Sequence, residues 1–120
     1  MEIEKFEELI EDVLKNVPEK FKNKLENLSI EIDQYNILPS EVINKKPENK
    51  IILALYHGVP LTKRSQGKPL FPDKITIYKK ALESISNSEQ DLIKNTKKAV
   101  LHELGHYFGL NEKTLKELGY

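Results

Sequence analysis

The chain has 120 residues, so we expect one domain over residues 1–120 with a single core. Nineteen Lys and Arg residues balance nineteen Asp and Glu residues, and this zero formal charge does not indicate a surface for nucleic acid or anionic lipid. The sequence contains no cysteine, no run of roughly 18 apolar residues that could span a membrane, and no export signal at its start. We therefore expect a cytoplasmic protein that binds neither nucleic acid nor membranes, in which a metal would need imidazole and carboxylate ligands.

The first third of the sequence predicts a helix, a second helical piece and a strand. Pro18 ends the first helix, and a second helical piece is expected near residues 21–25. Ile30 and Ile32 then alternate with polar residues, which is the pattern of a half-buried strand. Residues 2–17 carry apolar side chains at the spacing of one helical face, namely Phe6, Leu9, Ile10, Val13, Leu14 and Val17.

The middle of the chain predicts two strands separated by long loops. Prolines, asparagines and lysines make residues 39–50 a loop. Residues 51–56 are continuously apolar and rich in β-forming side chains, so we expect a central strand that ends at His57. Three prolines and two glycines predict a second loop over residues 58–73, and residues 74–79 then alternate as a further strand.

The last third predicts a long helix. Ser88, with Asp91 three residues later, is typical of a capped helix start. The helix can run to Phe108, and Gly109 is a natural stop because glycine adopts the left-handed conformation that ends many helices.

A short final helix over residues 112–118 would be capped by Asn111 and would pack through Leu115 and Leu118. The complete order of elements predicts an α+β fold. We expect a small mixed sheet of about three strands, backed by the N-terminal helix and the long helix, with the short helix at the C-terminus.

The long helix contains the sequence HELGH from His102 to His106. The two histidines are four residues apart, so their imidazoles project from one face and can share one tetrahedral metal ion. Glu103 is about 100° round the helix from His102 and about 60° from His106, close enough to hold a water at the metal without being a ligand. The pattern predicts a zinc site in which Glu103 is the general base.

The third ligand is expected after Gly109, which can turn the chain back beneath the metal. Glu112, ten residues after His102, is our first candidate because a carboxylate is a competent zinc ligand. Glu117 and a water molecule are the alternatives. Two imidazoles and one carboxylate leave the fourth position open, as in a catalytic rather than a structural zinc site.

HELGHYFGL with Glu112, preceded by LYHGVPLTKRS and DKITIYKK, resembles the minimal-zincin family of short bacterial zincin-like metallopeptidases, whose long motif is HExxHxxGxx followed by an acidic ligand. The similarity extends over most of the chain. It implies a small sheet behind the active-site helix, zinc held by His102, His106 and Glu112, and Glu103 as the general base. The resemblance implies a mechanism but not a substrate.

These observations predict a zinc-dependent hydrolase, in particular a peptidase that cleaves amide bonds in a peptide or protein. The alternatives are a zinc-binding module without turnover that acts through a protein partner, and an interaction domain without metal. Only eight residues follow Glu112, so we expect a shallow cleft, weak activity on generic substrates, and a partner chain or homo-oligomer that completes the cleft.

A second electrophile often assists zinc in stabilising the oxyanion. The candidates are His57, Arg64, Tyr78 and Tyr107, none of which is fixed by spacing. For each of them, packing or solvent exposure is the simpler explanation.

Overall fold

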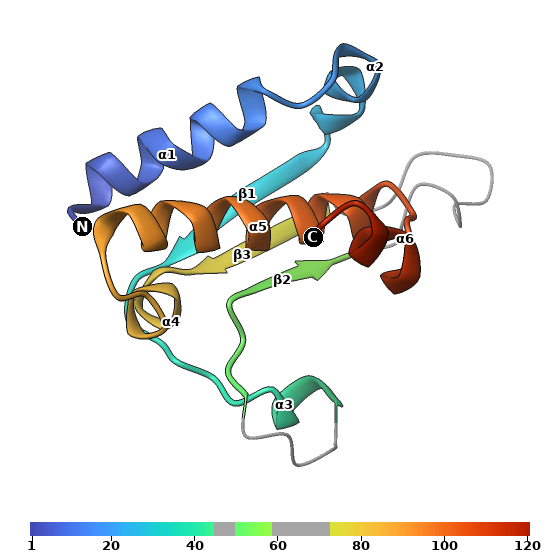
Figure 1. The fold of residues 1–120 in the computed structure, drawn as a ribbon. Helices are drawn as coiled ribbons and strands as arrows, with labels where there is room; N and C mark the ends of the chain where they lie inside the picture. The colour runs from blue at the N-terminus through green and yellow to red at the C-terminus, as the bar shows by residue number, and fades with distance from the viewer. Residues whose placement is uncertain (45–49, 59–72) are drawn as a thin grey trace.

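The computed structural model describes residues 1–44, 50–58 and 73–120, and its first element is the amphipathic helix α1, Ile3–Lys15 (Figure 1). Phe6, Ile10 and Val13 on its apolar face are buried, as their spacing predicted. Pro18 separates α1 from α2, Glu19–Lys22, and from the 3-10 turn η1, Asn23–Leu25. The predicted second helical piece is therefore confirmed.

Three strands form one mixed sheet. They are β1, Leu28–Asp33; β2, Ala54–His57; and β3, Asp73–Tyr78. β3 lies in the middle, parallel to β1 and antiparallel to β2. Ile75 in β3 consequently has Ile30 of β1 on one side and Tyr56 of β2 on the other.

The prediction of a central strand over residues 51–56 was wrong. The strand begins only at Ala54, and β2 is an edge strand with β3 as its one neighbour. The preceding residues are apolar for a different reason: Ile52 is buried with Tyr78 and Ala81 in a small second cluster. The apolar run over residues 51–56 therefore contributes to two structures. Its last part forms strand β2, and its first part packs in this cluster.

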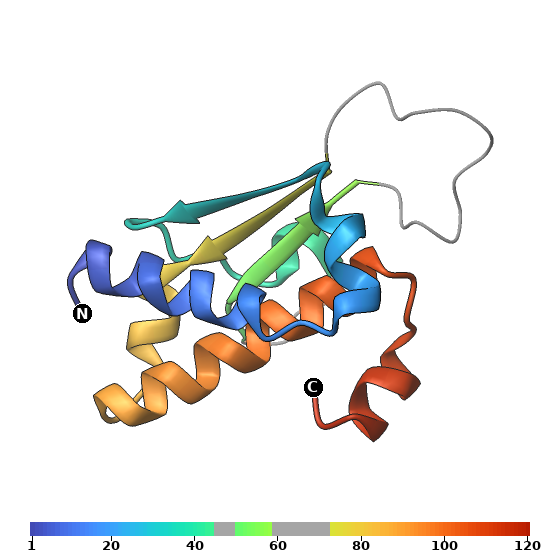
Figure 2. The ribbon, with the colours of Figure 1, turned by 90° about the horizontal axis from the view of Figure 1, so that it is seen from above.

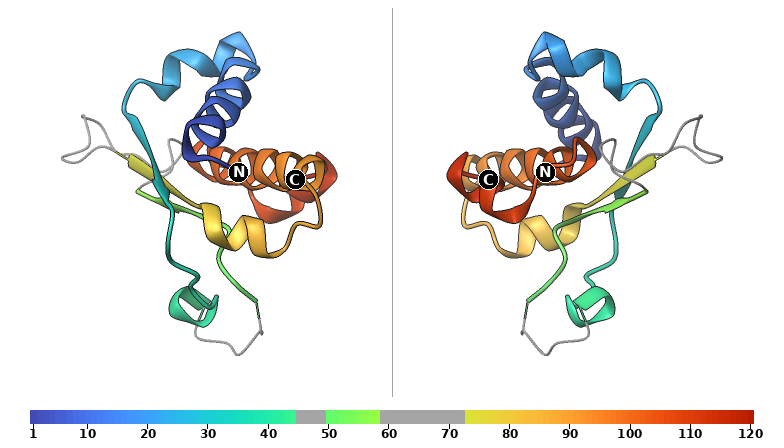
Figure 3. Two further views of the ribbon diagram at one scale, coloured as in Figure 1. Left: turned by 90° about the vertical axis from the view of Figure 1, so that its left-hand side faces the viewer. Right: turned by 90° about the vertical axis from the view of Figure 1, so that its right-hand side faces the viewer.

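Helix α1 and the long helix α5, Glu89–Tyr107, lie side by side on one face of the sheet (Figures 2 and 3). The α+β class and the sheet backed by these two helices are confirmed. Their apolar faces and the inner side of the sheet form the main core, whose fully buried members include Phe6, Ile75, Ile77, Leu82 and Val100.

Two short helices were not predicted. Helix α3, Glu41–Asn44, lies within the predicted first loop, and α4, Lys79–Ser84, begins at the residue that was expected to end the strand. Each has fewer than two turns, too short to show a helical period in the sequence.

The ends of α5 agree with the sequence signals. The Ser88 side chain accepts a hydrogen bond from the Asp91 N–H, and Gly109 ends the helix region with a φ of 89°. Helix α6, Glu112–Glu117, follows at once, and the Asn111 side chain caps it by accepting from the Thr114 N–H.

The expected packing of α6 was only half right. Leu115 is fully buried, whereas Leu118 is 56% exposed and lies beyond the last residue of the helix.

In the part of the chain that the structure describes, no helix is long and apolar enough to cross a bilayer.

Candidate metal centre

His102 and His106 face one another across a single turn of α5. Their Nε2 atoms are 3.1 Å apart, and the planes of the two rings meet at 74°. Both side chains are partly exposed, so the two nitrogens are accessible from outside the core. The four-residue spacing therefore places the two imidazoles as the sequence predicted.

Glu112 brings a carboxylate to the same point. Its Oε1 lies 2.8 Å from Nε2 of His106 and 3.3 Å from Nε2 of His102. Among the described residues, these three form a group whose possible ligand atoms all lie within 4.8 Å of one another. The predicted third residue is thus adjacent to both histidines.

The chain returns to the histidines through a tight connection after α5. Gly109 adopts a positive φ that side chains rarely permit, and the N–H of Leu110 donates to the Gly105 carbonyl at 2.9 Å. The Asn111 cap then starts α6, which places Glu112 in its first turn. Glycine at position 109 consequently directs the acidic side chain back toward α5.

Gly105, in the middle of HELGH, provides space for α6. A Cβ atom at this position would lie 2.2 Å from Cδ2 of the buried Leu115 and 3.3 Å from its Cγ. Without a side chain at position 105, Leu115 rests directly on the backbone of α5. This contact fixes the distance between α6, which carries Glu112, and the histidines.

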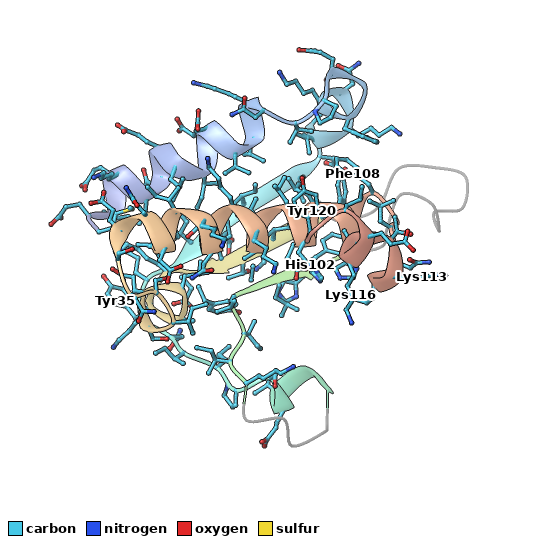
Figure 4. All side chains as sticks on the ribbon, in the orientation of Figure 1. Tyr35, His102, Phe108, Lys113, Lys116 and Tyr120 are labelled. Carbon is cyan, nitrogen blue, oxygen red and sulfur yellow. The ribbon has the colours of Figure 1, made fainter. Side chains whose placement is uncertain are left out.

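A main-chain oxygen orients His102. The ring Nδ1 lies 3.0 Å from the main-chain oxygen of Tyr120, and Figure 4 shows the two residues next to each other beside α6. That oxygen can only accept a hydrogen bond, so Nδ1 carries the proton and the lone pair of Nε2 is left for a ligand. Outer hydrogen bonds of this kind stabilise metal-binding histidines in the correct tautomer.

The spacing of the three donor atoms fits a zinc ion. Two ligand atoms at 2.0–2.1 Å from a tetrahedral zinc are about 3.3–3.4 Å apart. The corresponding separations here are 2.8, 3.1 and 3.3 Å, so each atom would move by roughly half an ångström or less. Two imidazole nitrogens and one carboxylate oxygen are also a ligand set that zinc favours.

Glu103 is tied to β2 by a hydrogen bond. Its Oε2 accepts a hydrogen bond of 3.0 Å from the Tyr56 N–H, which lies on the strand 47 residues earlier in the chain. Burial raises the pKa of Glu103 to about 7, although His102 and the Tyr56 N–H act in the opposite direction. A carboxyl with this pKa can both accept and release a proton near neutral pH.

The remaining predicted residues lie elsewhere. Tyr107 is 1% exposed and its hydroxyl donates to the Lys24 carbonyl, so it has a structural role. Tyr78 is buried in the second cluster, and burial raises its pKa. His57 is exposed at the end of β2 and outside the three-residue group, while Arg64 falls outside the described residues. These positions give no support for a second electrophile among His57, Tyr78 and Tyr107.

Glu117 is also absent from the group of three possible ligands in the described residues. It follows Glu112 by five positions in α6, which corresponds to about 140° round the helix. The two carboxylates therefore leave α6 in different directions.

Sequence reasoning missed the main-chain partners, the Tyr56 N–H and the Tyr120 oxygen. Every residue carries such groups, so their involvement has no signal in side-chain identity. The role of Gly105 was also missed, although a glycine inside a helix is a hint of close packing.

The chain matches the family described as zincin-like metallopeptidase over residues 25–120, which include β1, both histidines and α6. No curated protein shows a significant sequence match to the chain.

Proposed function

We propose that the chain, which belongs to the zincin-like metallopeptidase family, is a zinc-dependent peptidase. In this proposal His102, His106 and Glu112 are the metal ligands. Glu103 is the general base. The observation that carries the proposal is the convergence of three donor atoms of the right chemistry within 4.8 Å, with the partly buried carboxyl of Glu103 on the residue next to His102. A fold alone would not support a function, whereas this combination does.

When bound, zinc would supply Lewis-acid chemistry, which polarises the substrate carbonyl and lowers the pKa of the attacking water. Glu103 takes a proton from the attacking water at Oε1, because Oε2 is held by the Tyr56 N–H. The same carboxyl then gives the proton to the leaving amine. The Tyr56 hydrogen bond keeps the carboxyl in place through both transfers, and the Tyr120 oxygen keeps His102 in one orientation.

The test begins with chelator-treated protein that is reloaded with zinc and analysed for metal content. Cleavage is then followed by mass spectrometry on a library of unfolded proteins and on short peptides. We expect one zinc per chain and slow cleavage of selected sequences. Glu103→Gln should bind the same amount of zinc but lose at least about 100-fold in turnover.

His102→Ala is the matched variant that should lose zinc and turnover together. A protein that refuses added zinc would contradict the whole proposal. Zinc-loaded wild type without any turnover would instead leave a metal-holding module that acts through a partner, and equal turnover in the wild type and in Glu103→Gln would contradict the role of Glu103 as general base.

A further inference from the structure

A groove leads away from the candidate metal centre along α5. Its volume is about 490 Å³, and it extends from His102 and Glu103 over two helical turns to Asn95. The opposite wall is the segment over residues 50–54 that leads into β2. If the scissile amide of a substrate lies at the histidines, the residues on one side of that amide would therefore lie in this groove.

We propose that the groove binds an aliphatic side chain and a nearby carboxylate of the substrate, so that the protein acts on acidic peptide segments. This inference rests on the proposed peptidase function and adds a substrate class to it.

The floor of the groove is apolar. Leu53 and Ala54 line one side, Ala99 of α5 lines the other, and Ile85 stands at the far end with 43% of its surface exposed. An aliphatic side chain placed here removes apolar surface from water on both partners, at roughly 25 cal/mol per Å². The floor thus favours a branched aliphatic residue near the scissile bond.

The wall is preformed. The Ser40 N–H donates to the Lys50 carbonyl and the Ile52 N–H donates to the Leu38 carbonyl, both at 2.8 Å. These bonds tie residues 50–52 to residues 38–40 without any contact from a ligand. A groove that needs no reordering binds more tightly than one that must form on binding.

The rim of the groove carries two cationic side chains. Lys50 lines one wall and Lys98, four residues before His102, lines the other. Neither ammonium group takes part in an ion pair with any residue that the structure describes. Glu103 is the one acidic side chain among the described lining residues, and its Oε2 is engaged by the Tyr56 N–H.

Ser40 adds a buried hydroxyl to the same wall. The residue is 7% exposed, and its Oγ has no hydrogen-bond partner among the described residues although it is buried. This oxygen has almost no accessible surface, so the hydroxyl is enclosed in the wall and does not face a ligand in the groove. The two ammonium groups on the rim are the groups that fit a carboxylate.

The test measures binding rather than cleavage. The zinc-loaded full chain carrying Glu103→Gln is titrated into fluorescent acetyl peptides that end in Leu-Glu-amide, Leu-Gln-amide, Leu-Lys-amide and Leu-Gln with a free carboxylate. Anisotropy gives each dissociation constant, and metal content is measured on the same sample. Lys98→Glu is the test variant, and Lys97→Glu, on the neighbouring position outside the groove lining, is its matched control.

We expect Leu-Glu-amide to bind about three- to tenfold more tightly than Leu-Lys-amide, since two exposed ion pairs replace two repulsions. Lys98→Glu should abolish or reverse this preference, and Lys97→Glu should leave it within about twofold. A preference for Leu-Glu-amide over Leu-Gln-amide identifies a side-chain carboxylate as the ligand. A preference of the free acid over Leu-Gln-amide identifies the peptide C-terminus.

Equal binding of all four peptides, no binding of any, or equal effects of Lys97→Glu and Lys98→Glu would overturn the inference. The two proposals fail separately. Protein that takes up no zinc contradicts the peptidase, whereas zinc-loaded protein without a charge preference contradicts only the acidic substrate class.

Discussion

Neighbouring residues in HELGH have opposite environments. His102 presents its ring to solvent and to Glu112, whereas Glu103 is turned inward against β2. Leu104 is 1% exposed in the core and Gly105 lies against Leu115. Each position of the motif therefore has its own physical requirement, and the two positions that vary in the general pattern are constrained here by packing.

The raised pKa of Glu103 predicts a pH-dependent stability of the zinc-free protein. Its pKa is about 7 in the folded state and 4.5 ordinarily, so between these values the folded protein holds a proton that the unfolded chain has released. This contribution to stability is complete below about pH 4.5 and is lost as the pH rises through about 7. The loss is on the order of 3 kcal/mol.

Urea denaturation of chelator-treated protein at pH 5 and pH 8 measures this effect. Glu103→Gln, which cannot ionise, should exceed the wild type in stability by roughly 1 kcal/mol at pH 5 and by roughly 3 kcal/mol at pH 8. If the difference between wild type and variant is the same at both pH values, Glu103 does not titrate in this range.

Gly105→Ala should weaken zinc binding although alanine is the better helix former. The new methyl group would overlap Leu115 and displace α6, and with it Glu112. We expect the zinc affinity to fall by about ten- to a hundredfold in a competition assay with a chromophoric chelator. Ala99→Gly, on the same helix, is a control that should leave the affinity nearly unchanged. Unchanged affinity in Gly105→Ala, or an equal loss in both variants, would contradict the explanation.

At the scale of elements, the short helix α6 carries Glu112, the third donor. It has six residues and is held by the Asn111 cap and the buried Leu115. Helices this short are not stable alone, so its position depends on these two contacts. The third donor is consequently carried by a short helix whose position depends on tertiary contacts.

Asn111→Ala should lower the zinc affinity by about fivefold, which corresponds to a lost cap of roughly 1 kcal/mol. The same chelator competition measures it, and Asn111→Asp is the control because aspartate also caps helices. An equal loss in both variants would mean that the amide acts in another way.

The sequence predicted those elements whose signals are local. The Ser88 cap, the Gly109 stop and the Asn111 cap fixed the ends of α5 and α6, and the spacing of His102 and His106 fixed their geometry. Helical periodicity is a strong signal because it repeats within a few residues.

The order of strands was not predictable in this way. Apolar character alone cannot separate an interior strand from a segment such as residues 51–53, which packs in a cluster and then joins an edge strand. The hydrogen bond from the Tyr56 N–H to Glu103 depends on that order, since only an edge strand has free N–H groups to offer. Because β2 was predicted as a central strand, the hydrogen bond from the Tyr56 N–H to Glu103 could not be predicted.

At the scale of the whole molecule, zinc should stabilise the fold because its ligands come from two helices that pack on one core. At a free zinc concentration 100 times the dissociation constant, the gain in free energy of unfolding is about 2.7 kcal/mol. Thermal melts with and without zinc measure the gain. Glu103→Gln should retain it and His102→Ala should lose it; a zinc-dependent shift that survives His102→Ala would indicate another site.

The site also joins parts of the chain that differ widely in their separation along the sequence. His102, His106 and Glu112 lie within eleven consecutive residues, so closing that loop costs little entropy. The Tyr56 contact spans 47 residues, and it requires the non-local pairing of β2 with β3, which forms slowly. A chain that is still assembling its sheet can therefore capture zinc before its base is held in place. In a preparation that contains such chains, metal content would overstate the fraction of molecules that are competent for chemistry.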